Sequence, residues 1–157
     1  MKSGMAAVLG LTCMLVAGCG TQGPGVDWAA APAPATKVRV VYAHRTLRCV
    51  SCLLIEKLAR ETIQEEFAAR LADGTMKWQT VDFWQDKQFA DKYGVGSPTV
   101  VVITYVNGRQ ASYQRLDELW GLKMEGDRFR AVLKDAVGKA VREAGQPGNA
   151  GKTAARS

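Results

Sequence analysis

Histidine, cysteine and long apolar runs are all scarce in this chain. It contains one histidine and four cysteines, so a metal site built only from these side chains has few ligands to draw on. No glycine-rich dinucleotide motif and no flavin signature is present, and we therefore expect no bound cofactor. The apolar run at residues 5–17 is about thirteen residues long, whereas a membrane-spanning helix needs about 20.

The composition is that of an ordinary soluble domain. Of the 157 residues, 47% are hydrophobic and 23% are charged. These values exclude a wholly disordered chain, a collagen and a multi-pass membrane protein, and the length suits one domain. The formal charge is +6, but the basic side chains are spread along the chain and form no cluster. We therefore expect no nucleic-acid partner.

The first residues predict an export signal. Met1-Lys2 gives a positive start, and the apolar run behind it ends in Leu15-Val16-Ala17-Gly18-Cys19, which resembles the bacterial lipobox. That resemblance implies a signal at 1–18 and lipidation of Cys19. The chain would then sit on the exported side of a bacterial cell envelope, in the periplasm of a cell with two membranes. Because Gly20 is not the Asp associated with inner-membrane retention, the outer membrane is favoured. The alternative is an ordinary signal cut nearby, with Cys19 incidental.

The rest of the chain divides into a tether, a domain and a tail. Residues 19–36 are rich in Gly, Pro and Ala, and such a segment buries too little surface to offset its ordering entropy. We expect a flexible tether there, a folded domain at 37–144 and a disordered basic tail at 145–157.

Periodicity within the domain predicts an α/β fold with a central mixed sheet flanked by helices. β-branched runs predict strands at 37–43, 76–83, 99–105 and 110–116, and Asn107-Gly108 predicts a two-residue hairpin turn between the last two. Helical spacing predicts a helix from Cys49 through residue 69 that ends near 73–74, a short one at 86–93 and a last one at 127–143. The order βαβα followed by ββα implies parallel pairing first and an antiparallel hairpin second.

Two cysteines of the domain, Cys49 and Cys52, are spaced C-x-x-C. A disulfide that closes so small a loop constrains the unfolded chain very little, so a chemical role is favoured over a structural one. At 100° per residue, Cys52 falls in the middle of the apolar arc of the long helix, and Cys49 falls at its edge in the first turn. We therefore predict a buried Cys52 and a reachable Cys49. Glu56, one turn beyond Cys52, is interpreted as a solvated helix-edge residue in preference to a proton acceptor.

These motifs together resemble the thioredoxin fold. A C-x-x-C opens the first helix, and 92–99 (Lys-Tyr-Gly-Val-Gly-Ser-Pro-Thr) resembles the thioredoxin segment that leads to a cis-proline and Thr. The resemblance implies a cis Ser97–Pro98 bond facing the dithiol, with Ser97 and Pro98 in substrate binding. Two features depart from that family: Arg48 replaces the Trp before the first Cys, and residues 38–48 contain no acid.

A closer resemblance joins residues 44–52 and 116–120 to a family of exported bacterial thioredoxin-like proteins. These are labelled nitrophenyl-compound nitroreductase subunits and are associated with arsenic-resistance clusters. One dithiol carries two electrons, whereas reduction of a nitro group to an amine takes six. The resemblance therefore implies a redox subunit of a system that acts on nitroaromatic or arsenical compounds.

The residues predict a thiol–disulfide oxidoreductase. The helix N-terminus, Arg48, Arg45 and His44 are each expected to lower the pKa of Cys49. Cys49 would attack a disulfide, and Cys52 would resolve the mixed disulfide. The partner would be a protein thiol or disulfide, or a membrane electron donor.

Two alternatives remain open at this point. In the first, His44, Cys49 and Cys52 bind a soft metal ion or an arsenic(III) species. In the second, the chain is an anchored scaffold with the same fold and no catalysis.

Overall fold

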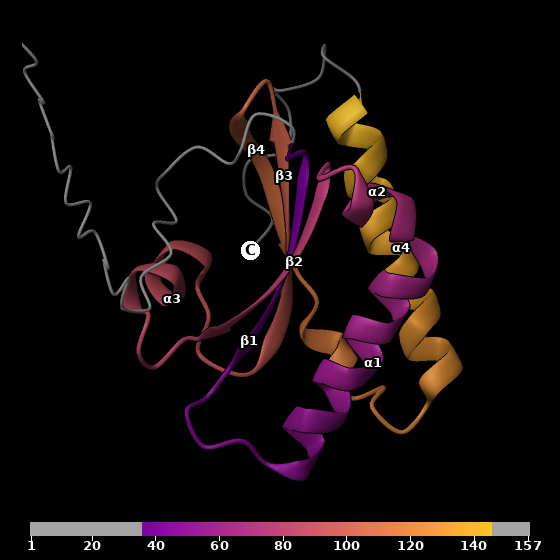
Figure 1. Ribbon diagram of the computed structural model, residues 1–157. Coiled ribbons are helices and arrows are strands. Elements are labelled where there is room, and N and C mark those ends of the chain that lie inside the picture. Colours follow the sequence, from indigo (N-terminus) through magenta and orange to yellow (C-terminus); the bar gives the residue numbers. More distant parts are fainter. Residues whose placement is uncertain (1–35, 146–157) are drawn as a thin grey trace, which may run out of the picture.

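The structure, a computed structural model, describes residues 36–145 (Figure 1). The predicted export signal, the lipidation site Cys19 and nearly all of the predicted tether and tail lie outside this range. Its elements, in chain order, are β1 (Val38–His44), α1 (Val50–Glu66), α2 (Ala68–Ala72), β2 (Met76–Asp82), α3 (Lys87–Tyr93), β3 (Thr99–Val106), β4 (Arg109–Arg115), the 3-10 helix η1 (Asp117–Trp120) and α4 (Gly126–Gly145).

The four strands form one mixed sheet in the order β2-β1-β3-β4. β1 pairs with β2 in parallel and with β3 antiparallel, and β3 pairs antiparallel with β4. The hairpin turn between β3 and β4 has positive φ at both Asn107 (52°) and Gly108 (74°), as a primed two-residue turn requires. The predicted fold class, including the parallel first half and the antiparallel second half, is confirmed.

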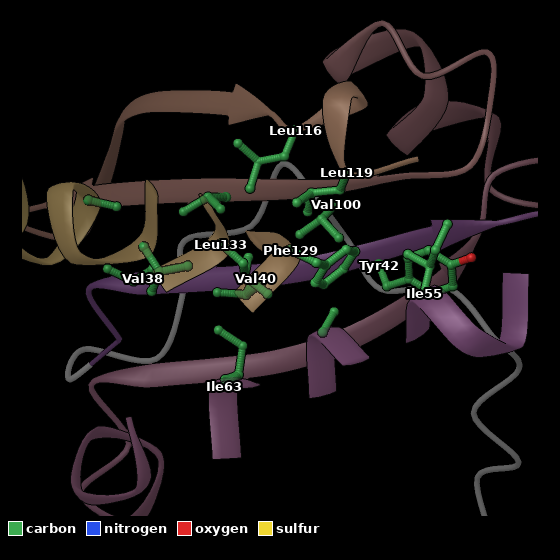
Figure 2. Packing of buried hydrophobic residues seen from close by; sticks show 14 of the residues in the cluster. Val38, Val40, Tyr42, Ile55, Ile63, Val100, Leu116, Leu119, Phe129 and Leu133 are labelled. Atoms are coloured by element: carbon green, nitrogen blue, oxygen red, sulfur yellow. The ribbon is translucent and has the colours of Figure 1, made fainter. Parts of the chain in front are cut away.

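Alternation along the two central strands gives the sheet two apolar faces, each covered by helices. Helices α1, α2 and α4 lie on one side of the sheet, and α3 lies on the other (Figure 1). On the α1/α4 side, β1 contributes Val38, Val40 and Tyr42 to a core that α1 and α4 complete (Figure 2). On the α3 side, Val41 and Ala43 pack with residues of α3 and β3. Side chains two residues apart share a face of a strand, so Tyr42 is fixed on the side of the sheet that holds α1.

The structure differs from the predicted elements at three boundaries. The predicted helix that starts at Cys49 is interrupted at Phe67, where φ is −129° and ψ is 24°, and α2 follows as a separate turn. Phe67 packs against the α1/α4 core. The sequence around Phe67 contains no signal that predicts a break in the helix. Thr36, placed in the predicted tether, is buried, and its hydroxyl donates to the carbonyl of Gly74 at 3.3 Å. Gly145, placed in the predicted tail, is the last residue of α4.

Within residues 36–145, no helix has the length and apolar character needed to cross a membrane.

Candidate active site

The dithiol lies near the end of the sheet at which β1 ends. His44 ends β1, residues 45–49 form a short loop, and α1 begins at Val50. The register places Thr99, the first residue of β3, opposite Ala43 near the end of β1. The chain before β3 therefore approaches the same end of the sheet as the loop before α1.

Cys49 caps the N-terminus of α1. Its backbone is extended, with φ −84° and ψ 165°, and its Sγ accepts a hydrogen bond from the Cys52 backbone N–H at 3.2 Å. A side-chain oxygen of Ser, Thr, Asn or Asp usually occupies this place, and a thiolate is a suitable acceptor there because it carries charge. Helix α1 has no acidic residue in its first turn, so nothing there offsets the positive end of the helix dipole. Cys49 therefore lies one residue before the first turn of α1, in which it was predicted to lie.

The two thiols have opposite environments, as predicted. Cys49 is exposed, whereas only 3% of Cys52 is exposed. Hydrogen bonds from the Cys52 thiol and the Cys52 backbone N–H lower the pKa of Cys49, because both stabilise its thiolate. Burial, and then the hydrogen bond to Cys49, raise the pKa of Cys52. One sulfur is therefore reachable and favours the thiolate, and the other is covered and favours the thiol.

Tyr42 connects the sheet to the helix beneath the dithiol. Its ring is fully buried, and its hydroxyl donates to the Cys52 carbonyl oxygen at 2.9 Å. Burial raises the pKa of Tyr42, so the hydroxyl stays protonated and can donate. The bond joins β1 to the first turn of α1.

Arg48 contacts residues of α1 and β1. Its guanidinium forms an ion pair with the Glu56 carboxylate and lies over the Tyr42 ring, with 5.9 Å from Cζ to the ring centroid. Burial raises the pKa of Cys52, and the charge of Arg48 offsets part of that rise. Glu56 is only 6% exposed and also pairs with Arg60, so the interpretation of Glu56 as a solvated residue is wrong. A buried carboxylate requires such partners. Sequence spacing alone did not identify Arg48, on the loop before α1, as one of them.

The other two residues predicted to lower the Cys49 pKa make different contacts. Arg45 lies over the Trp84 ring, 5.4 Å from its centroid. His44 is half-buried at the end of β1, with Nδ1 2.9 Å from the Arg45 carbonyl oxygen. The expected influence of Arg48, Arg45 and His44 on Cys49 stays a prediction.

Three exposed apolar side chains are near the reachable thiol in the sequence. Leu47 is 81% exposed, Val50 84% and Leu53 50%, and all three lie within four residues of Cys49 in the sequence. Sequence reasoning missed this group, although its residues could be read directly from the loop and the first turn. Exposed apolar side chains gathered at one place are typical of a contact surface for another molecule.

The Ser97–Pro98 bond is trans, so the predicted cis bond is wrong. Gly94 makes the turn that ends α3, with φ 64°, and Pro98 then precedes the first paired residue of β3. A trans proline is tolerated there because no ladder hydrogen bond needs its missing N–H. The trans bond also counts against a partner-pairing edge of the thioredoxin type. The role of Ser97 and Pro98 in substrate binding stays a prediction, without the geometry that motivated it.

The proposed soft-metal site is not assembled. Among residues 36–145, no group of three His, Cys, Asp or Glu side chains is placed to hold a metal ion. His44, the third ligand of that alternative, faces the loop backbone at the carbonyl of Arg45. The alternative thus has no support from the arrangement of its three side chains.

The element order, the parallel and antiparallel pairings and a C-x-x-C at the start of α1 match what the sequence predicted. The fold is thioredoxin-like.

Comparisons with known proteins add structural neighbours only. No family model and no curated protein matches the chain. Among solved structures, chloroplastic thioredoxin z is 18% identical, with a TM-score of 0.38 and coverage of 59% of this chain and 80% of its own. The zinc-bound form of human ERp44 is 22% identical at a TM-score of 0.41, with 64% of this chain covered. This chain spans 27% of the ERp44 chain. A malarial protein is 16% identical at a TM-score of 0.37, with coverage of 58% and 98%.

Proposed function

We propose that this protein is a thiol–disulfide oxidoreductase in which Cys49 is the nucleophile and Cys52 the resolving thiol. The observation that carries the proposal is the asymmetry of the pair. Cys49 is exposed at the helix N-terminus with hydrogen bonds that favour its thiolate, and Cys52 is buried one turn away. Exchange needs a reachable thiolate for attack and a protected second thiol that acts only after the mixed disulfide has formed.

The exchange balances without a cofactor. The Cys49 thiolate attacks one sulfur of a partner disulfide, a mixed disulfide forms, and the other partner sulfur leaves as a thiolate. The Cys52 thiolate then attacks Cys49, and the second partner sulfur leaves. The partner disulfide is reduced and the protein dithiol is oxidised, and the reverse sequence oxidises a partner.

The apolar side chains beside the thiol favour a protein partner. Leu47, Val50 and Leu53 are all exposed beside Cys49, and burial of such a group against a partner surface contributes favourably to association. A small polar disulfide would leave most of this surface in water. A membrane electron donor with an apolar docking face fits the same description.

The proposal extends to location. The lipobox-like sequence before Cys19 supports an exported protein anchored by acyl chains, with the domain tethered outside the membrane. Mass spectrometry of the mature N-terminus tests it: an acylated Cys19 is expected, and a free amino group at another residue contradicts it. A role as redox subunit of a system acting on nitroaromatic or arsenical compounds rests on the sequence resemblance alone.

Trapping tests the roles of the two thiols. In a protein that also carries Cys13→Ser and Cys19→Ser, we expect Cys52→Ser to accumulate a mixed disulfide with oxidised glutathione through Cys49, since no second thiol is then present to release it. Cys49→Ser is the matched control and should accumulate little adduct, because Cys52 is buried. Adducts on Cys52 that form faster than those on Cys49 would reverse the assignment.

A further inference from the structure

The contacts of the Arg48 side chain place its charge on the side of α1 that holds the buried Cys52 thiol. Arg48 immediately precedes Cys49, yet its guanidinium reaches back to Glu56, four residues beyond Cys52 on α1. Residues four apart share a helix face, so Cys52 and Glu56 lie on the same face. The guanidinium also lies over the ring of Tyr42, whose hydroxyl binds the Cys52 carbonyl.

These contacts hold the cation in place. Only 28% of the Arg48 side chain and 8% of the Glu56 side chain are exposed, so the pair is shielded from the screening that weakens surface ion pairs. The planar guanidinium can pair with a carboxylate and stack on a ring at the same time, which an ammonium group does less well. The position of the charge is therefore set by Glu56 on one side and Tyr42 on the other.

The resolving step needs a thiolate at Cys52. In the reduced protein the neighbouring Cys52 thiol stabilises the Cys49 thiolate and keeps its own proton. Once Cys49 is bonded to a partner, its sulfur no longer carries charge and is a poor acceptor. The Cys52 thiol must then release its proton to water while buried, and burial disfavours the thiolate. A fixed cation nearby reduces that cost.

We propose that Arg48 is a positioning residue for the resolving step, held by Glu56 and Tyr42 so that its charge favours the Cys52 thiolate as the Cys49–Cys52 disulfide closes. The proposal rests on the proposed function. The charged and titratable groups that bear on Cys52 are Cys49, Tyr42, Arg48 and Glu56.

Release of 2-nitro-5-thiobenzoate from 5,5′-dithiobis(2-nitrobenzoate) separates the two steps. The first equivalent reports attack by Cys49, and the second reports closure by Cys52. The full chain is used with Cys13→Ser and Cys19→Ser, so that only the two thiols of the site react. Both phases are followed by stopped-flow absorbance from pH 6 to pH 10.

Arg48→Met should slow closure by a larger factor than it slows the first phase. Without the cation the pKa of the Cys52 thiol rises further, so a smaller fraction of it is thiolate at pH 7. The greater nucleophilicity of the more basic thiolate offsets part of this loss, and we expect closure to slow about threefold. The slowing should disappear at a pH above the pKa of Cys52. Arg48→Lys keeps the charge and should stay within twofold.

Arg60→Met is the matched control. It removes an arginine from the same Glu56 carboxylate but leaves Arg48 beside Tyr42, so closure should stay within twofold. Equal slowing in both variants would overturn the proposal, since the effect would then come from an uncovered Glu56 charge. Unchanged closure in Arg48→Met would also overturn it. A parent protein that never releases the second equivalent would overturn the proposed function as well.

Discussion

The Tyr42 hydroxyl gives a direct test of how the sheet holds the redox helix. The ring of Tyr42 is fully buried, and its hydroxyl donates to the Cys52 carbonyl oxygen at 2.9 Å. Tyr42→Phe removes that hydrogen bond and keeps the ring. A buried hydrogen bond contributes about 0.5–1.5 kcal/mol net, so we expect a loss of about 1 kcal/mol in the free energy of unfolding. In a domain of this size, that corresponds to a fall of about 4 °C or slightly more in Tm.

Urea unfolding followed by circular dichroism measures the loss, with the slope m checked to be the same in both proteins. Tyr113→Phe is the control, because Tyr113 is 46% exposed on the edge strand β4, and surface changes usually stay within about 0.5 kcal/mol. If Tyr42→Phe is no less stable than Tyr113→Phe, the bond between β1 and α1 does not stabilise the fold and this reasoning fails.

Three further outcomes follow from the structure. Gly94 ends α3 at φ 64°, so Gly94→Ala should lower stability by about 1 kcal/mol, and an unchanged urea midpoint would count against it. Arg39 is 7% exposed, its Nε and Nη1 have no hydrogen-bond partner, and its Cζ is 5.3 Å from the centre of the Tyr105 ring. Arg39→Met should therefore leave the free energy of unfolding unchanged or raise it. A loss above about 2 kcal/mol would show that the cation–π contact outweighs the cost of the buried, unpaired nitrogens. Because hydrogen bonds to its sulfur lower the pKa of Cys49, alkylation of Cys49 by iodoacetamide should reach half its maximal rate at a lower pH than alkylation of free cysteine under the same conditions. That midpoint should rise in Cys52→Ala, which removes the thiol donor but not the backbone N–H, and a midpoint that does not move would remove the thiol from the explanation.

The fold and the asymmetry of the dithiol could be predicted because both depend on local periodicity. β-branched runs located the strands, and the 100° spacing of α1 placed Cys52 in the apolar arc. The Asn107-Gly108 turn was equally readable, because its conformation is set by those two residues alone. These features require no knowledge of which distant side chains meet.

The wrong predictions concern features that do depend on which distant side chains meet. Burial of Glu56 depends on a pairing with Arg48 across the loop, which the eight-residue separation did not indicate. The cis prediction for Pro98 came from a resemblance, whereas the turn is made earlier, at Gly94. The break at Phe67 carries no glycine or proline, and that side chain instead packs on the core. Each of these outcomes is decided by tertiary contacts that override local preference.

The central claim is that Cys49 and Cys52 form a reversible dithiol–disulfide couple, and the reduction potential of that pair tests it most directly. The protein, with Cys13→Ser and Cys19→Ser, is equilibrated in glutathione buffers of graded ratio, trapped by acid and alkylated, and the fraction of disulfide is read by mass. We predict a single two-electron transition with a potential in the range of exchange-active proteins, about −120 to −270 mV. A pair that forms no disulfide at any ratio, or one that stays oxidised below about −300 mV as structural disulfides do, would contradict the account.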